Sequence, residues 1–176
     1  VGTLTEVWHF LRLLYVKLGV QHYIHDDAPV QPQSADSIAA QLLRSYSGQH
    51  IGLLAPLVVA RKGIYTELAQ WAHARGHSHL RVDGAFVPTV GFPKLDRFKE
   101  HSIELPVFSL DVRPDNEALL RDKLALALQL GKGVVQVMSD LDGLAGDVGH
   151  DAHTLGLGRV QVFSTLRACP QCATSY

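Results

Sequence analysis

The sequence predicts an α+β domain with a mixed or antiparallel sheet and about four helices. Two observations lead to this class. Segments with helical and with strand periodicity alternate irregularly along the 176 residues, and one pair of predicted strands is joined by a two-residue turn typical of antiparallel hairpins. Apolar residues make up 47% of the chain, which is ordinary for a globular protein and excludes intrinsic disorder.

The first predicted element is a helix that ends near residue 18. Thr3 and Glu6 have the spacing of a capping box, and apolar residues recur at helical spacing until Gly19, which suits a helix end. Other apolar side chains lie outside this stripe, namely Trp8, Leu13 and Val16. Because the helix is apolar on more than one side, we expect it to pack against something larger than the rest of this chain.

A polar, proline-containing connector over residues 20–33 leads to a second predicted helix. Ser34 is suited to cap the start of this helix, which extends to about Tyr46. The apolar segment 50–60 then predicts a buried strand, in which Pro56 indicates either an edge position or a bend.

A turn over residues 61–63 leads to a third predicted helix over 64–75. The following segment, 80–87, predicts a β-hairpin, because two short apolar runs flank Asp83 and Gly84. Asp-Gly between alternating apolar residues is the strongest short hairpin signal.

A charged crossing over residues 94–101 precedes a strand predicted over 102–112. Pro114 suits the start of a fourth helix, and Gly131 suits its end. Two further strands are expected over 134–138 and 160–163. The stretch between them, 140–158, is rich in Gly, Asp and His and has few apolar anchors, so we expect a mobile loop.

Composition and motifs exclude several functions. The 16 basic and 17 acidic residues give a net charge of −1, whereas a domain that grips nucleic acid by its backbone is usually basic. No phosphate-binding loop and no Gly-x-Ser-x-Gly motif occur, so we expect no enzyme. No apolar run approaches the ~20 residues needed to cross a bilayer, and the chain opens without a secretion leader. The two cysteines are too few to staple a secreted domain, so we expect a cytosolic protein without membrane contact.

A zinc site is one hypothesis for these cysteines. Cys169 and Cys172 have the spacing at which two thiolates hold one tetrahedral ion. His22 and His25 share this spacing and complete a His2Cys2 set. The alternative is that the histidines are ordinary loop residues and that the cysteines pair with ligands outside this chain.

Basic residues gather in two places. Arg61 and Lys62 follow the first strand, and three more alternate with acidic residues in the charged crossing, namely Lys94, Arg97 and Lys99. Interleaved signs favour a protein partner with a complementary charged face over a phosphate backbone. The alternative is a solvated surface that binds nothing.

Several strings, in the same order along nearly the whole chain, resemble the UvrA family, whose members are the ATPase and damage-sensing subunit of the bacterial excinuclease ABC. They are Val-Gly-Thr-Leu-Thr-Glu at 1–6, Leu-Arg-Leu-Leu at 11–14, Leu-Ala-Pro-Leu-Val at 54–58, Arg-Lys-Gly at 61–63, Arg-Val-Asp-Gly at 81–84, His-Ser-Ile-Glu at 101–104 and Ala-Cys-Pro-Gln-Cys at 168–172. No single string is decisive, but the collinear series is specific.

The resemblance implies a fragment of a nucleotide excision repair protein that docks UvrB. It divides the chain into a helix and connector from the parent ATPase (1–33), a UvrB-binding α+β domain (34–139), the mobile loop (140–158) and a return strand with the Cys-x-x-Cys end (159–176). The parent would contact DNA and form a homodimer. Both Walker A loops and both ABC signature strings of the family are absent from the sequence.

The residues we expect to contact UvrB are charged and lie in the matched strings or beside them: Arg61, Lys62, Arg81, Asp83, Lys94, Arg97 and Lys99. Two other functions stay open, namely a direct DNA-binding segment and a structural insertion stapled by zinc.

The sequence also departs from the family pattern. Tyr23 and Asp26 stand where family members have Cys and His, so zinc here requires His22 and His25 in a shifted register. Such departures are typical of a divergent second copy of the family protein.

Overall fold

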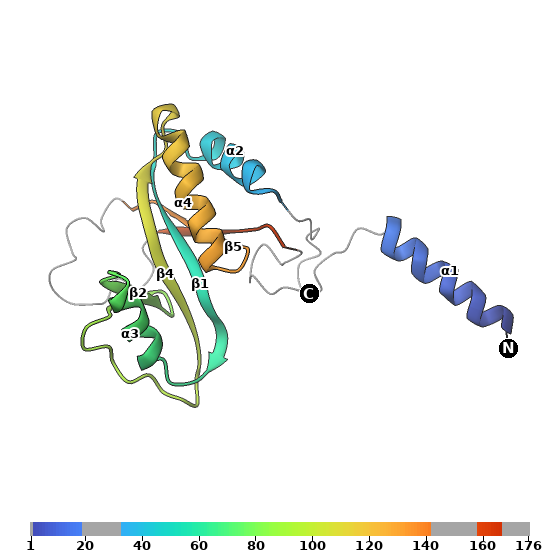
Figure 1. The fold of residues 1–176 in the computed structure, drawn as a ribbon, viewed down its shortest axis with the longest axis horizontal. Coiled ribbons are helices and arrows are strands. Elements are labelled where there is room, and N and C mark those ends of the chain that lie inside the picture. The colour runs from blue at the N-terminus through green and yellow to red at the C-terminus, as the bar shows by residue number, and fades with distance from the viewer. Residues whose placement is uncertain (1, 19–32, 142–157, 167–176) are drawn as a thin grey trace.

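The fold is an α+β arrangement built on one six-stranded antiparallel sheet. It is seen in a computed structural model that describes residues 2–18, 33–141 and 158–166 (Figure 1). The strand order is β3-β2-β4-β1-β5-β6, and every neighbouring pair is antiparallel. The predicted fold class is therefore confirmed, and the sheet is antiparallel rather than mixed.

The elements follow the predicted order along the described chain. They are α1 (Gly2–Leu18), α2 (Ala35–Ser45), β1 (His50–Lys62), α3 (Thr66–Ala74), β2 (His79–Val82), β3 (Ala85–Pro88), β4 (Glu100–Asp111), the 3-10 helix η1 (Pro114–Asn116), α4 (Glu117–Leu130), β5 (Val134–Ser139) and β6 (Arg159–Ser164). Each helix and strand predicted from periodicity is present. The expected mobile loop lies almost wholly outside the described residues, so its mobility stays a prediction.

Local signals at the helix ends explain where these elements begin. The Oγ of Ser34 accepts a hydrogen bond from the backbone N–H of Ser37 at 3.0 Å, so the predicted cap of α2 is confirmed. The capping prediction for the first helix is wrong, because α1 already begins at Gly2 and Thr3 lies inside it.

β1 is a central strand of the sheet, so the hypothesis that Pro56 marks an edge strand is wrong. β1 pairs with β4 along its whole length but with β5 only through Gly52–Leu54, so at Pro56 it has lost its second neighbour. The missing N–H of proline therefore interrupts little pairing there. The pairing with β4 shifts register between Pro56 and Val58, which agrees with the alternative that this strand is irregular at the proline.

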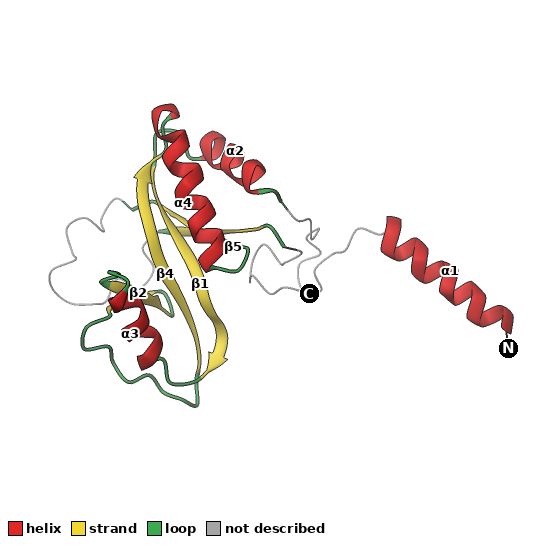
Figure 2. Ribbon diagram, viewed as in Figure 1, coloured by secondary structure: helices red, strands yellow, loops and turns green. Residues whose placement is uncertain are grey.

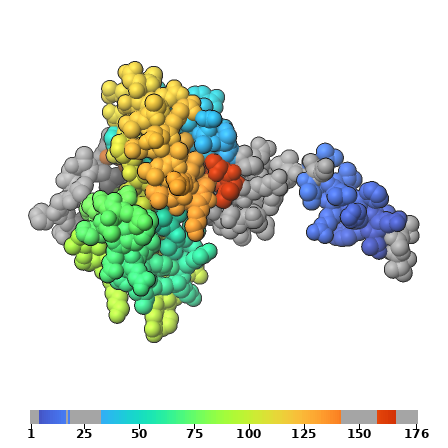
Figure 3. All heavy atoms as spheres, in the orientation of Figure 1, coloured from blue at the N-terminus to red at the C-terminus, as the bar shows by residue number. Residues whose placement is uncertain are grey.

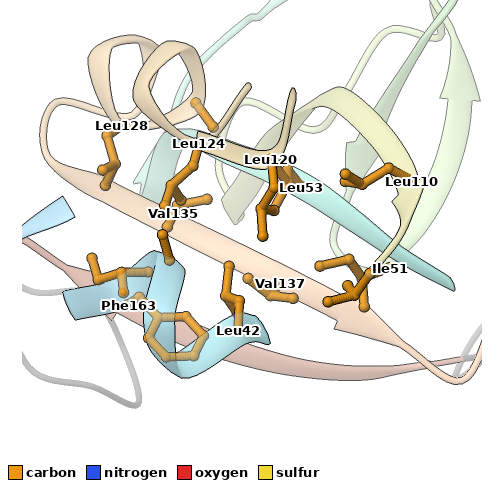
Figure 4. Close-up of a cluster of buried hydrophobic side chains, with 14 residues drawn as sticks. Leu42, Ile51, Leu53, Leu110, Leu120, Leu124, Leu128, Val135, Val137 and Phe163 are labelled. Atoms are coloured by element: carbon orange, nitrogen blue, oxygen red, sulfur yellow. The ribbon is translucent and has the colours of Figure 1, made fainter. Parts of the chain in front are cut away.

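Two clusters of buried side chains divide the domain into halves. The α2/α4 half comprises α2, α4, β5, β6 and the beginning of β1 with the end of β4; its cluster holds large residues such as Leu42, Leu53 and Phe163 (Figure 4). The α3 half comprises α3, β2, β3 and the end of β1 with the beginning of β4. Its smaller cluster includes Ala69 and Ala72. In Figure 2, α4 crosses in front of β1 and β4 beside α2, and α3 lies toward the other end of these strands.

In Figure 3 the atoms of helix α1 lie apart from those of the other described elements. Its described apolar side chains are exposed on several sides, with Trp8 at 71% and Val16 at 70%. The expectation that this helix packs against a larger body stays a prediction.

Candidate functional site

Arg61 and Lys62 lie at the last two positions of β1, where the sequence predicted a turn. The strand continues through both residues because they pair with β4, Arg61 opposite His101 and Lys62 opposite Glu100. Both side chains are exposed. Pairing with β4 thus fixes these two cations at one end of the β1–β4 pair, next to α3 in Figure 1.

A bulge in β1 directly precedes these cations. The register with β4 shifts between Val58 and Arg61, and Ala60 adopts a positive φ of 45°. The N–H of Ala60 donates to the Oγ of Ser102 at 3.2 Å and so leaves the strand ladder. A bulge bends its strand and redirects the side chains that follow, so it sets the direction in which Arg61 and Lys62 are presented.

The segment before β4 forms a hydrogen-bonded turn over Asp96–Lys99. The carboxylate of Asp96 accepts from the backbone N–H of Phe98 at 2.9 Å, and its carbonyl oxygen accepts from the N–H of Lys99 at 3.1 Å. Arg97 and Lys99 are exposed on this turn, and Lys94 is exposed just before it. Three of the predicted contact residues therefore occupy one connection.

His101 joins this turn to the β2–β3 hairpin. Its Nδ1 lies 2.6 Å from the Oδ2 of Asp83, and its Nε2 lies 2.9 Å from the carbonyl oxygen of Asp96. Both partners only accept, so the doubly protonated ring makes both bonds. The hydrogen bond to Asp83 is the main cause that raises the pKa of this histidine, and the bond to the Asp96 carbonyl raises it further. Burial acts in the opposite direction. The histidine is buried, with 7% of its surface exposed.

Asp83 has a structural role in the hairpin. It and Gly84 both have positive φ, 49° and 92°, as a two-residue type I′ turn requires. The Oδ1 of Asp83 also accepts from the N–H of Ser102 at 2.8 Å. The carboxylate predicted to contact a partner is thus already bonded to β4.

Arg81 is largely buried and paired inside the domain. Its Nη1 lies 3.3 Å from the Oε2 of Glu104, and the side chains are 16% and 7% exposed. Burial raises the pKa of Glu104, and the nearby Arg81 charge counteracts this. The Nε of Arg81 is buried without a hydrogen-bond partner among the described residues. Of the predicted contacts, this residue is the least available to a partner.

The other five predicted contacts form a group that we call the cationic end: Arg61, Lys62, Lys94, Arg97 and Lys99. None of them lies within 4.0 Å of a carboxylate of another described residue. Arg121 on α4, in contrast, is paired, with Asp36 at 2.6 Å and with Glu117 at 2.8 Å. The cationic end therefore presents charge that the described fold does not neutralise.

Sequence reasoning missed two residues of this site. Phe98 is 70% exposed at the tip of the Asp96–Lys99 turn, and the guanidinium carbon of Arg97 lies 4.6 Å from the centre of its ring. An aromatic residue inside a charged loop was the available signal for Phe98. His101 offered none, because its two acceptors come from segments that only the fold brings together.

The predicted zinc ligands Cys169, Cys172, His22 and His25 all lie outside the described residues, so the zinc site stays a prediction. Within the described ranges, no group of three or more His, Cys, Asp and Glu side chains is placed to hold a metal ion. None of the described helices combines the length and apolar character needed to span a bilayer.

Comparison with known proteins identifies relatives along the whole chain. UvrABC system protein A of Mycobacterium bovis is 37% identical over 171 residues, which cover 97% of this chain and 16% of the relative. The protein of the same name from Pseudomonas aeruginosa is 33% identical over 175 residues, covering 99% of this chain and 17% of the relative. The chain thus spans about a sixth of the length of the curated relatives it matches.

The family model for the UvrA interaction domain matches residues 33–140. This range contains α2 to β5 and every residue of the cationic end. The resemblance noted in the sequence is therefore confirmed, and the chain belongs to the UvrA interaction domain family.

Proposed function

We propose that this chain is the UvrB-docking module of a UvrA-like protein in nucleotide excision repair and that the cationic end makes the main contact. The observation that carries the proposal is that five exposed cations occupy this end and that no carboxylate of the described residues lies within ion-pair distance of any of them. A charged surface without internal partners is suited to meet a complementary surface.

The expected partner surface is acidic. Docking an unpaired charged side chain costs less free energy than docking a paired one, because no ion pair within the domain has to break first. Exposed charges also steer association, and ions screen this steering over about 10 Å at 0.1 M salt. Docking should therefore weaken as salt is added. The interface itself should bury about 1,200 to 2,000 Å2, with a few anchor residues supplying most of the binding energy.

Charge reversal tests the proposal. We expect Lys62→Glu combined with Arg97→Glu to weaken the binding of UvrB from the same organism by about a hundredfold, measured by calorimetry on the full chain, because two attractive contacts become repulsive. Lys132→Glu is the matched control: this cation is exposed in the α4–β5 turn, away from the cationic end, and should leave the Kd within about twofold.

Two results would count against docking through this surface. One is an unchanged Kd for the reversed variant; the other is salt-independent binding. Tight binding of the unmodified chain to duplex DNA, lost on charge reversal while UvrB still binds, would favour the DNA-binding alternative instead.

A further inference from the structure

The Asp96–Lys99 turn carries an aromatic side chain where a solvated charged loop does not need one. Phe98 is 70% exposed, and Arg97 lies over its ring at 4.6 Å. A single exposed apolar residue is ordinary on a protein surface. Here, however, the residue stands inside the cationic end and shares its turn with Arg97 and Lys99, neither of which pairs with a carboxylate of the described residues.

The turn is held in place before any partner arrives. Asp96 accepts three hydrogen bonds: its carboxylate from the Phe98 N–H at 2.9 Å, and its carbonyl oxygen from the Lys99 N–H at 3.1 Å and from the His101 ring at 2.9 Å. His101 is in turn fixed by Asp83 in the hairpin. The backbone that carries Phe98 is thus ordered by two neighbouring strands, and ordering it on binding would add little entropy loss.

We propose that the Asp96–Lys99 turn is a preformed anchor that inserts the ring of Phe98 into an apolar recess of the docked protein, while the guanidinium of Arg97 pairs with a carboxylate at the rim of that recess. The proposal rests on the docking function given above and adds the kind of surface that the partner must offer. Aromatic residues and arginine are enriched at protein interfaces, and arginine is also enriched among the residues that carry most of the binding energy.

Charge favours a protein over a nucleic acid as the occupant. Exposed acidic side chains border the anchor, since Glu100 follows Lys99 and Asp96 precedes Arg97. A phosphate backbone carries only negative charge and would be repelled by them, whereas a protein surface can place acidic groups opposite the cations and basic groups opposite Asp96 and Glu100. Nucleic acid, on which Phe98 would stack, is accordingly treated as an outcome of the test.

The first test removes the ring. In the full chain, Phe98→Ala should weaken the Kd for UvrB by about tenfold to thirtyfold, and Phe98→Leu, which keeps apolar volume, should recover part of the loss. Val90→Ala is the matched control, because Val90 is also exposed, at 66%, in the same β3–β4 connection. It should change the Kd by less than about twofold.

The second test separates the turn from its charge. Asp96→Asn keeps an acceptor for the Phe98 N–H but removes the carboxylate charge, whereas Asp96→Ala removes both. If the preformed turn matters, Asp96→Ala should bind UvrB about fivefold more weakly than Asp96→Asn. Equal affinities for the two variants would overturn the claim that the turn is preorganised for binding.

Failure of the anchor can be told from failure of docking. Wild-type affinity for Phe98→Ala, together with a large loss for Lys62→Glu combined with Arg97→Glu, would overturn the anchor and leave docking in place. Wild-type affinity for both variants would remove both proposals. If Phe98→Ala lowered affinity for single-stranded DNA but not for UvrB, Phe98 would be a stacking surface for nucleic acid and the anchor would be wrong.

Discussion

The α2/α4 half and the α3 half of the domain use the same kinds of residues in different ways. The α2/α4 half buries fourteen apolar side chains and joins α4 to α2 through the Arg121 bonds to Asp36 and Glu117. The α3 half buries only seven apolar side chains and places a polar network in the interior. It also carries five exposed cations that no carboxylate of the described residues pairs.

This difference indicates that one half mainly stabilises the domain and the other mainly shapes its docking surface. Buried apolar side chains supply most of the hydrophobic stabilisation, and the α2/α4 half has twice as many of them, so the stability of the domain rests mainly on that half. The interior hydrogen bonds and ion pair of the α3 half instead fix the hairpin, β4 and the turn before it relative to one another. The α3 half is thus built to hold a surface in a defined shape, which is what docking requires.

The largest effect should come from the core of the α2/α4 half. Leu120 is fully buried against β1 and β5 residues, so Leu120→Ala should lower the free energy of unfolding by about 2 to 5 kcal/mol in urea titrations. The Kd for UvrB per folded molecule should stay unchanged. A variant of normal stability with weakened UvrB binding would contradict this division between the two halves.

A smaller loss should follow from removing Arg81. Arg81→Ala leaves Glu104 buried without its partner, and we expect a loss of about 2 to 3 kcal/mol in the free energy of unfolding. Burial raises the pKa of Glu104 above its unfolded value, and Arg81 counteracts that rise. Without Arg81 the folded pKa should rise further, so the variant should regain stability as the pH is lowered and Glu104 is protonated.

The outcome for Arg81→Ala also decides the role of this residue. If melting temperature is unchanged and only UvrB affinity falls, Arg81 is a partner contact, as the sequence suggested, and its pairing with Glu104 is incidental.

The smallest effect should come from His101. The hydrogen bonds to Asp83 and to the Asp96 carbonyl raise the pKa of His101 in the folded state. Its contribution to the free energy of unfolding is therefore fully present below the unfolded pKa of about 6.5 and is lost as the pH rises through the folded pKa. The other neighbours of this ring are Tyr65, in edge contact, and Arg61, opposite it across the β1–β4 pair.

The wild-type chain should therefore lose about 1 kcal/mol of stability between pH 6 and pH 8, and His101→Gln should lose less over the same range. Thermal melting at several pH values measures the difference. Parallel pH profiles for the two proteins would show that His101 does not hold the turn through its second proton.

The sequence predicts local structure well because local signals determine it. Ser34 caps its helix by bonding three residues away, and the Asp83-Gly84 turn needs only its own positive φ values. Features that depend on distant partners escaped prediction. Pro56 left an edge position and a bend open, because nothing local says that the pairing of β1 with β5 ends at Leu54. Arg81 was predicted to contact UvrB, and its internal partner, Glu104, could not be foreseen because it lies 23 residues away.

The site shows the same limit. Residue type alone identified the five cations of the cationic end. Their position at one end of the sheet, however, depends on the register between β1 and β4. Phe98 was missed because exposure at a turn cannot be derived from spacing.

Hydrogen exchange of the full chain, with and without UvrB, compares the two halves most directly. Docking through the cationic end predicts slower exchange on UvrB binding at the end of β1 and over residues 94–101, with little change in α2 and α4. Slower exchange confined to α2 and α4, with the Asp96–Lys99 turn unaffected, would contradict it.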